Sequence, residues 1–168
     1  MEIEIERKFL VLSKPNVQPD AVYKIKQGYV ARDNGNTVRI REKNGVFILT
    51  IKTPRLESGG RHELEYEIPK DEGELLFKYI AHEPIIKVRE VFEIGTLKWE
   101  VDTFEGENQG LIVAEVELES LDQSIDIPEW IGPEVTHLKK FYNAKLAVYP
   151  FSNWNMNYKN LLKQLKTK

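Results

Sequence analysis

Carboxylates alternate with aliphatic residues at the start of the chain, Met-Glu-Ile-Glu-Ile-Glu-Arg-Lys-Phe. In an extended strand the side chains alternate between two faces, so Glu4, Glu6 and Lys8 share one face. Neighbouring carboxylates on that face lie about 6.5–7 Å apart and repel by about 2 kcal/mol at an effective dielectric constant of about 20. A positive partner offsets this cost, and a divalent metal ion is the simplest candidate. A solvated edge strand is the alternative interpretation.

Later segments also carry charges of one sign at every second position. The basic positions are Arg39, Arg41, Lys52, Lys87 and Arg89. The acidic positions are Glu63, Glu65, Glu100, Asp102, Glu115 and Glu117. Surfaces selected only for solubility usually intersperse the two signs, so this segregation favours acidic and basic strands that face one another across an interior. Such an interior suits a polyphosphate bound by Arg and Lys, with carboxylates that hold Mg²⁺ or Mn²⁺. Eight amphipathic strands with solvated charges are the alternative.

The elements that position these residues follow from turn signals and apolar spacing. Eight strands are predicted, at residues 2–12, 21–32, 37–43, 46–53, 61–68, 85–94, 96–104 and 111–120. Three helices are predicted, at residues 70–82, 133–148 and 152–166. Eight antiparallel strands are about the number that closes a barrel able to hold one small ligand. The predicted fold class is therefore α+β and predominantly antiparallel β: a closed eight-stranded barrel with a charged interior and helices packed outside.

The composition limits the class of protein. The 168 residues are 41% hydrophobic and 30% charged, which fits one globular domain with a sizeable core. A net charge of −3 argues against a general nucleic-acid binder, and the absence of cysteine excludes disulfides and thiolate metal sites. The acidic start does not fit a signal peptide, and no apolar run reaches the roughly 18 residues of a membrane span. We expect a cytoplasmic protein with neither a membrane nor a nucleic-acid partner.

The order of the charged motifs resembles the CYTH superfamily of triphosphate tunnel metalloenzymes. Glu4-Ile5-Glu6-Arg7-Lys8 is similar to the family's Glu-x-Glu-x-Lys motif, and it lies at the N-terminus as in that family. The motifs that follow are Gln27-Gly28-Tyr29, Arg39-x-Arg41, Thr50-Ile51-Lys52, Glu63-x-Glu65, Lys87-x-Arg89, Glu100-x-Asp102, Glu115-Val116-Glu117 and Lys139-Lys140-Phe141-x-Asn143. The resemblance covers about 145 residues and implies a single-domain bacterial CYTH protein with a closed eight-stranded tunnel.

The resemblance also implies roles for the charged residues. The metal ligands would be Glu4 and Glu6 with Glu115 and Glu117. The residues that grip the triphosphate would be Lys8, Arg39, Arg41, Lys52, Lys87 and Arg89, with Lys26 and Lys139 at the tunnel mouth or on a helix that plugs it. The residues that complete the metal shell or position water would be Glu63, Glu65, Glu100 and Asp102. A carboxylate of the Glu100–Asp102 strand, or Glu4, would orient or deprotonate the attacking water, while Lys8 stabilises the transferred phosphoryl group.

Metal-dependent hydrolysis of inorganic triphosphate to pyrophosphate and phosphate is the favoured function, because the opening Glu-Ile-Glu-Arg-Lys-Phe-Leu resembles the bacterial triphosphatase branch. Thiamine triphosphate and nucleoside triphosphates are other candidate substrates. Two alternatives stay open: a class IV adenylate cyclase that makes cyclic AMP and pyrophosphate from ATP, and a non-catalytic module that binds triphosphate or polyphosphate. We expect a CYTH domain at residues 1–150. Residues 151–168 would form an amphipathic helix that packs on the barrel or pairs with a second copy in a homodimer.

Overall fold

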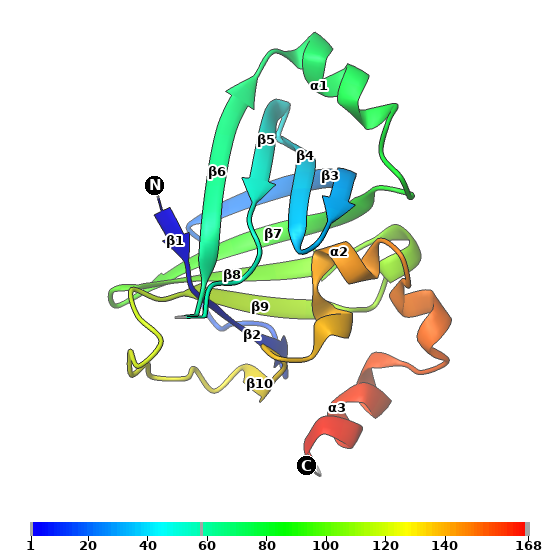
Figure 1. Cartoon of the computed structure of the whole chain (residues 1–168). Helices are drawn as coiled ribbons and strands as arrows, with labels where there is room; N and C mark the ends of the chain where they lie inside the picture. The colour runs from blue at the N-terminus through cyan, green and yellow to red at the C-terminus, as the bar shows by residue number, and fades with distance from the viewer. Residues whose placement is uncertain (1, 58, 167–168) are drawn as a thin grey trace.

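The computed structural model describes residues 2–57 and 59–166, which form an α+β fold dominated by antiparallel strands (Figure 1). The ten strands are β1 (Glu2–Glu4), β2 (Glu6–Val11), β3 (Ala21–Asp33), β4 (Asn36–Lys43), β5 (Val46–Lys52), β6 (Arg61–Ile68), β7 (Ile85–Ile94), β8 (Leu97–Phe104), β9 (Ile112–Glu117) and β10 (Ile131–Glu134). The α-helices are α1 (Lys70–Phe77), α2 (Asn143–Leu146) and α3 (Tyr158–Lys166). The 3-10 helices are η1 (Gly106–Asn108), η2 (Lys139–Phe141) and η3 (Phe151–Trp154).

All ten strands belong to one antiparallel sheet, in the order β1-β6-β5-β4-β3-β7-β8-β9-β2-β10. Every segment predicted to be a strand contains one, but the first is split at Ile5, and β10 was not predicted. The two halves of the N-terminal segment pair with opposite ends of the series, β1 with β6 and β2 with β9. The ring is therefore completed by the chain through Ile5 rather than by an uninterrupted hydrogen-bonded ladder, which is a small departure from the closed barrel expected.

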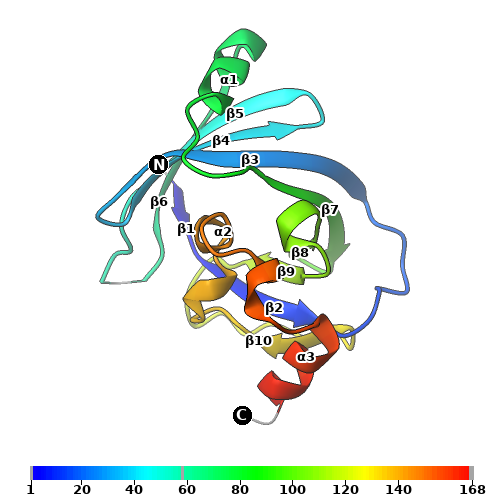
Figure 2. The ribbon, with the colours of Figure 1, turned by 90° about the vertical axis from the view of Figure 1, so that its right-hand side faces the viewer.

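One end of the interior is apolar instead of charged. On β2, β8 and β9 the inward positions that continue the charged faces are Leu10, Phe104 and Val113, and all three are buried. They pack in one cluster with residues from η2, α2, η3 and α3. Figure 2 shows α2 lying across the ring, with α3 below it. The C-terminal segment thus fills one end of the ring, and the charged cavity occupies the remainder.

The outer face of β2, β8 and β9 carries a second apolar cluster. It contains Phe9, Trp99 and Val116, which are out of phase with the charged positions. The segment that leads to β10 covers this cluster, and Trp130 packs edge-on against Trp99 with ring centroids 5.7 Å apart. An extended segment, rather than one of the predicted helices, supplies the apolar cover on this face.

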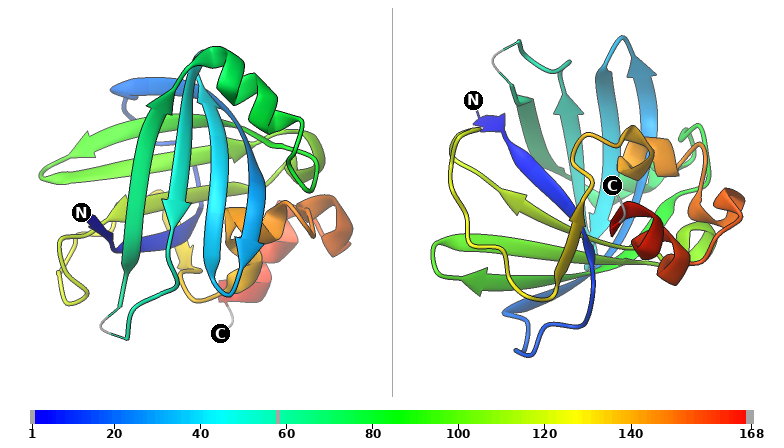
Figure 3. Two further views of the ribbon diagram at one scale, coloured as in Figure 1. Left: turned by 45° about the horizontal axis from the view of Figure 1, so that its top comes forward. Right: turned by 90° about the horizontal axis from the view of Figure 1, so that it is seen from below.

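The predicted helices were too long. Helix α1 ends at Phe77 rather than His82, and it packs on β3, β4 and β5 at one edge of the molecule (Figure 3). The helix expected at residues 133–148 was wrong, because β10 takes up its start and only the short η2 and α2 follow. The last predicted helix is divided into η3 and α3 by Asn155, whose φ of 53° ends the first piece.

Helix α3 packs its apolar stripe on the barrel. Leu161 is fully buried, and the Tyr158 hydroxyl accepts a hydrogen bond from the Val11 backbone N–H at 2.8 Å. The same hydroxyl lies 2.8 Å from the backbone carbonyl of Ile112, to which it donates. Tyr158 therefore joins β2 to the start of β9. None of the helices in the described part of the chain is long and apolar enough to cross a membrane.

Candidate functional site

The charged side chains of the strands line one cavity of about 270 Å³. Period-two alternation is the cause, because it turns every second side chain of each strand inward. The basic lining residues are Lys8, Arg39, Arg41, Lys43, Lys52, Arg55, Arg61, Arg89 and Lys98. The acidic lining residues are Glu4, Glu6, Glu63, Glu65, Glu100, Glu115 and Glu117. Segments that are far apart in sequence thus contribute to a single polar interior.

At one side of the cavity, the carboxylate of Glu4 on β1 is held by two cations. Lys52 Nζ lies 2.5 Å from Glu4 Oε1, and Arg61 Nε lies 2.9 Å from Glu4 Oε2. Lys52 also contacts Glu63 Oε2 at 3.2 Å, which brings the two carboxylates together on one ammonium group. Register explains the arrangement, since β1 pairs with β6 and β6 pairs with β5.

The two carboxylates differ in affinity for protons. Burial acts to raise the pKa of Glu4, but the charges of Lys52 and Arg61 outweigh it and lower that pKa to about 2. Burial raises the pKa of Glu63 to about 7, and the nearby negative charge of Glu4 adds to the rise. The pair therefore retains one proton close to neutral pH, as carboxylates that share a site do.

Lys8 on β2 lies between two carboxylates. Its Nζ is 3.0 Å from Glu6 and 2.6 Å from Glu115, and its side chain is almost wholly buried. Burial opposes the charged form of Lys8, but the two carboxylates outweigh it and hold its pKa above the ordinary value. The charges of Lys8 and Arg89 likewise hold the pKa of Glu115 well below its ordinary value against the effect of burial. Both groups are therefore ionised at neutral pH.

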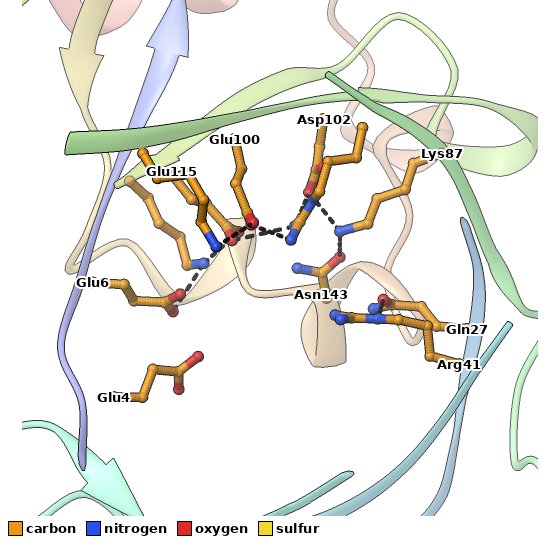
Figure 4. Close-up of polar contacts among 12 residues, drawn as sticks. Glu4, Glu6, Gln27, Arg41, Lys87, Glu100, Asp102, Glu115 and Asn143 are labelled. Atoms are coloured by element: carbon orange, nitrogen blue, oxygen red, sulfur yellow. Dashed lines mark hydrogen bonds and ion pairs between the residues drawn. The ribbon is translucent and has the colours of Figure 1, made fainter. Parts of the chain in front are cut away.

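Asp102 on β8 is buried behind the cavity and does not line it. Arg89 approaches it through two nitrogens at 2.7 Å each, and Lys87 Nζ lies 2.5 Å away (Figure 4). Both oxygens of Asp102 are thus occupied, which contradicts its predicted placement among groups that meet water or a metal ion. Lys87 is buried with it and is also 3.1 Å from Asn143 Oδ1 on α2. Burial lowers the pKa of Lys87 to about 8 although Asp102 favours the charged form.

Two further predicted residues lie away from the cavity. Lys26 is exposed on the outer face of β3, with its Nζ 4.7 Å from the centre of the Phe77 ring. Lys139 is exposed on η2. Period-two alternation accounts for Lys26, whose neighbour Gln27 takes the inward position. The expected position of Lys26 at the tunnel mouth was therefore wrong, whereas Lys139 lies on η2, in the segment that fills one end of the ring, and its binding role stays a prediction.

The structure brings the other predicted residues together around the cavity, twelve in all. These are Glu4, Glu6, Lys8, Arg39, Arg41, Lys52, Glu63, Glu65, Arg89, Glu100, Glu115 and Glu117. Arg39 contacts Glu63 and Glu65 at 3.5 and 3.3 Å, and it donates to the Thr50 hydroxyl at 3.0 Å. Arg89 pairs with Glu100 as well as Asp102. Their individual catalytic, metal-binding and phosphate-binding roles stay predictions.

Several lining residues were not among the predicted site. Arg61, Lys43 and Lys98 continue the charged faces of their strands, so the alternation itself signals them. Arg55 lies in a loop, and Tyr142 belongs to the segment wrongly predicted as a helix. The Arg55 guanidinium lies 5.7 Å from the centre of the Tyr142 ring, so these two residues meet at one border of the cavity. No local pattern in the sequence predicts that contact.

Comparison with known proteins agrees with this architecture. The family model described as CYTH domain matches residues 2–145. A protein of Acetivibrio thermocellus named inorganic triphosphatase is 37% identical over 152 residues, 90% of this chain and 97% of that protein. A protein of Nitrosomonas europaea with the same name is 34% identical over 152 residues, 86% of this chain and 97% of that protein. A crystal structure of an inorganic triphosphatase has a TM-score of 0.65 and 30% identity, and the match covers 88% of this chain and 96% of that one.

Proposed function

The chain belongs to the CYTH domain family, and we propose that it hydrolyses inorganic triphosphate to pyrophosphate and phosphate with the help of a divalent metal ion. The observation that carries the proposal is the cavity itself, where nine basic side chains, eight from strands and one from a loop, converge with seven carboxylates. Arg and Lys bind phosphate oxygens, and Arg binds them through two parallel hydrogen bonds. A linear chain of phosphoryl groups fits an interior that offers donors from many sides.

The rest of the lining favours an inorganic substrate over a nucleotide. The aliphatic residues among the described lining residues are Ala144 and Val116, and the side chain of Val116 belongs to the outer apolar cluster. Tyr29 and Tyr142 are the aromatic ones. Tyr29 is buried in the wall, so its ring offers little surface to a base. Small-molecule sites that bind a base or another organic group usually present several apolar or aromatic side chains. The cyclase alternative needs such a surface for adenine, and this wall provides little of it.

Substrate binding requires an exchange of partners inside the cavity. In the free protein Lys52 is held by Glu4 and Glu63, and Lys8 by Glu6 and Glu115. When phosphate oxygens take over these ammonium groups, carboxylate oxygens are released within the same cavity. The basic side chains thereby stabilise the negative charge of the transferred phosphoryl group.

The released carboxylates suit a divalent cation in their chemistry, since Mg²⁺ and Mn²⁺ prefer hard oxygen ligands. Glu4, Glu6, Glu115 and Glu117 would hold it, and it would neutralise charge on the phosphate oxygens during transfer. Within residues 2–57 and 59–166, no group of three acidic or histidine side chains is already arranged around a metal position. Burial raises the pKa of Glu63, and the nearby charge of Glu4 adds to the rise. Such a cluster gains from added positive charge.

Glu4 and Glu100 remain the proposed groups that orient or deprotonate the attacking water. Both line the cavity, whereas Asp102 is enclosed by Lys87 and Arg89. Water attacks the terminal phosphorus in line with the bridging oxygen, the bond to that oxygen breaks, and pyrophosphate leaves with the electron pair.

The test is product analysis with Mg²⁺ or Mn²⁺ on inorganic triphosphate, thiamine triphosphate and ATP in parallel. Release of phosphate and pyrophosphate from inorganic triphosphate, with poor use of the other two, is the expected result. Cyclic AMP and pyrophosphate from ATP would assign the cyclase activity instead. Tight binding of triphosphate without turnover would leave a binding module. Glu6→Gln should abolish metal-dependent turnover, and Glu129→Gln, at an exposed position, is the matched control.

A further inference from the structure

One guanidinium group in the cavity has neither an ion-pair partner nor an aromatic ring against it among the described residues. Of the basic lining residues, Arg41, Lys43 and Arg55 form no ion pair with any described residue, whereas the other six do. Lys43 lies over the ring of Tyr23 and Arg55 over the ring of Tyr142. Among the described residues, no carboxylate forms an ion pair with Arg41 and no aromatic ring lies against it. Its hydrogen bond goes to a neutral amide.

That amide belongs to Gln27, which lies opposite Arg41 on the neighbouring strand. Arg41 Nε donates to Gln27 Oε1 at 3.2 Å, and Figure 4 shows the two side chains together, across the cavity from Glu4 and Glu6. A guanidinium group can only donate, so the oxygen of the amide must face it. Gln27 is fully buried, and its Nε2 has no hydrogen-bond partner in the part of the chain that is described.

Strand order explains why no carboxylate reaches Arg41 from the neighbouring strand. The neighbouring positions of β3 on the face of Gln27 are Ile25 and Tyr29, and both are uncharged. Strand β3 lies between β4, which carries Arg39 and Arg41, and β7, which carries Lys87 and Arg89. Burial and the positive charges of Arg39 and Arg89 lower the pKa of Arg41 to about 10, against the opposing attraction of Glu65 and Asp102. At neutral pH Arg41 is therefore still charged, and none of the described carboxylates is in ion-pair contact with it.

We propose that Gln27 is a positioning residue. Its side-chain oxygen holds the Nε of Arg41, and because Gln27 is uncharged it leaves the guanidinium without an ion-pair partner. The guanidinium is thereby available to a phosphoryl group of the substrate. The Arg41 side chain lines the cavity, and its two terminal nitrogens form no hydrogen bond within the described residues. They can therefore take two oxygens of one phosphoryl group in parallel. A carboxylate at position 27 would form an ion pair with Arg41. It would then compete with the phosphoryl group of the substrate for the guanidinium.

Packing alone does not account for an amide at this position. A buried donor without a partner destabilises a fold, and an apolar side chain of similar length would avoid that cost. The chain instead retains the one neutral side chain of this size that offers an acceptor to Arg41. The oxygen of Gln27 thus has a use that compensates for its unpaired Nε2.

This inference rests on the proposed function for the identity of the anion, and two variants test it. Gln27→Glu keeps the size of the side chain and adds a charge beside Arg41, whereas Gln27→Met removes the acceptor. Gln18→Glu adds the same charge at an exposed position and is the matched control. Three quantities are measured for each protein: the melting temperature without ligand, the Kd of inorganic triphosphate by calorimetry in EDTA, and KM and kcat with Mg²⁺.

We expect Gln27→Glu to raise the melting temperature and to weaken triphosphate binding at least tenfold, with KM rising more than kcat falls. Gln27→Met should weaken binding by about three- to tenfold without lowering the melting temperature, because removing one charge-assisted hydrogen bond partner has an effect of that size. Opposite changes in stability and affinity are the result that a purely structural glutamine would not produce.

Unchanged affinity in Gln27→Glu or Gln27→Met, beside an active wild type, would overturn the inference and leave the proposed hydrolysis intact. A loss of affinity only in proportion to a lower melting temperature would overturn it too. Should the wild type bind triphosphate but not hydrolyse it, the proposed function fails while the binding data still decide the role of Gln27. A wild type that does not bind triphosphate at all would overturn both.

Discussion

Replacement of Asp102 by asparagine should lower the stability of the folded protein, because the role of Asp102 is structural and not that of a catalytic base. The side chain is wholly buried and is the one carboxylate in ion-pair contact with Lys87 among the described residues. Arg89 keeps Glu100 and Glu115 as partners in the variant, but Lys87 is left without a counter-charge in the interior. Breaking a buried pair by removing one partner costs about 3–5 kcal/mol, and the retained size of asparagine favours the lower figure of about 3 kcal/mol.

For a chain of this length, a loss of about 3 kcal/mol lowers the melting temperature by roughly 6–12 °C. Thermal and urea unfolding of Asp102→Asn would be measured beside Asp126→Asn, which removes a carboxylate at an exposed position. At a temperature where the variant is still folded, we expect residual hydrolysis of inorganic triphosphate. A melting temperature within about 2 °C of the wild type, which by the same scaling is less than about 1 kcal/mol, together with complete loss of turnover would refute the reasoning and return Asp102 to the reacting groups.

Three further predictions follow from single contacts. The pKa of Glu63 is raised to about 7 in the folded protein, so its contribution to stability is full below its ordinary pKa and is lost as pH rises through 7. Glu63→Gln should therefore be about 1–2 kcal/mol more stable than the wild type at pH 8.5 and little changed at pH 5. Urea unfolding at both pH values checks this. Tyr158→Phe leaves the Val11 N–H without an acceptor and should lower folding stability by about 1–3 kcal/mol, with kcat unchanged. Unchanged stability would contradict the bridging role of the hydroxyl. A methyl group on Gly73 would overlap the Phe47 ring, so Gly73→Ala should destabilise by about 1–3 kcal/mol through α1, and a variant that melts like the wild type would show that α1 shifts freely.

Strand positions and inward faces could be predicted from the sequence because alternation and turn residues are local signals. The turns at residues 33–36 and 44–45 are examples, since Asn34, Gly35, Asn44 and Gly45 all have the positive φ that such hairpins require. The division of the first strand at Ile5 depends on which strands meet at the two ends of the sheet. Nothing local encodes that pairing.

The same distinction between local and non-local signals applies to the site. A charge at every second position predicts a shared face, but it does not say how deep along the barrel each residue lies. Asp102 and Glu100 share a face, yet only Glu100 reaches the cavity, because Lys87 and Arg89 enclose the other. The lengths of the helices at residues 139–166 were missed for a related reason: their apolar residues have helical spacing, while tertiary packing decides that only short helices form.

The charges of the cavity explain why substrate and metal should bind together. Nine basic and seven acidic lining residues leave a formal charge of +2 when all are ionised, in a chain whose net charge is −3. A triphosphate carries more negative charge than this surplus offsets, so its binding alone leaves the interior negative. The proposed divalent cation would restore the balance and would be bound by the carboxylates that Lys8 and Lys52 release. Since coupling between two ligands is reciprocal, each should tighten the binding of the other by the same factor.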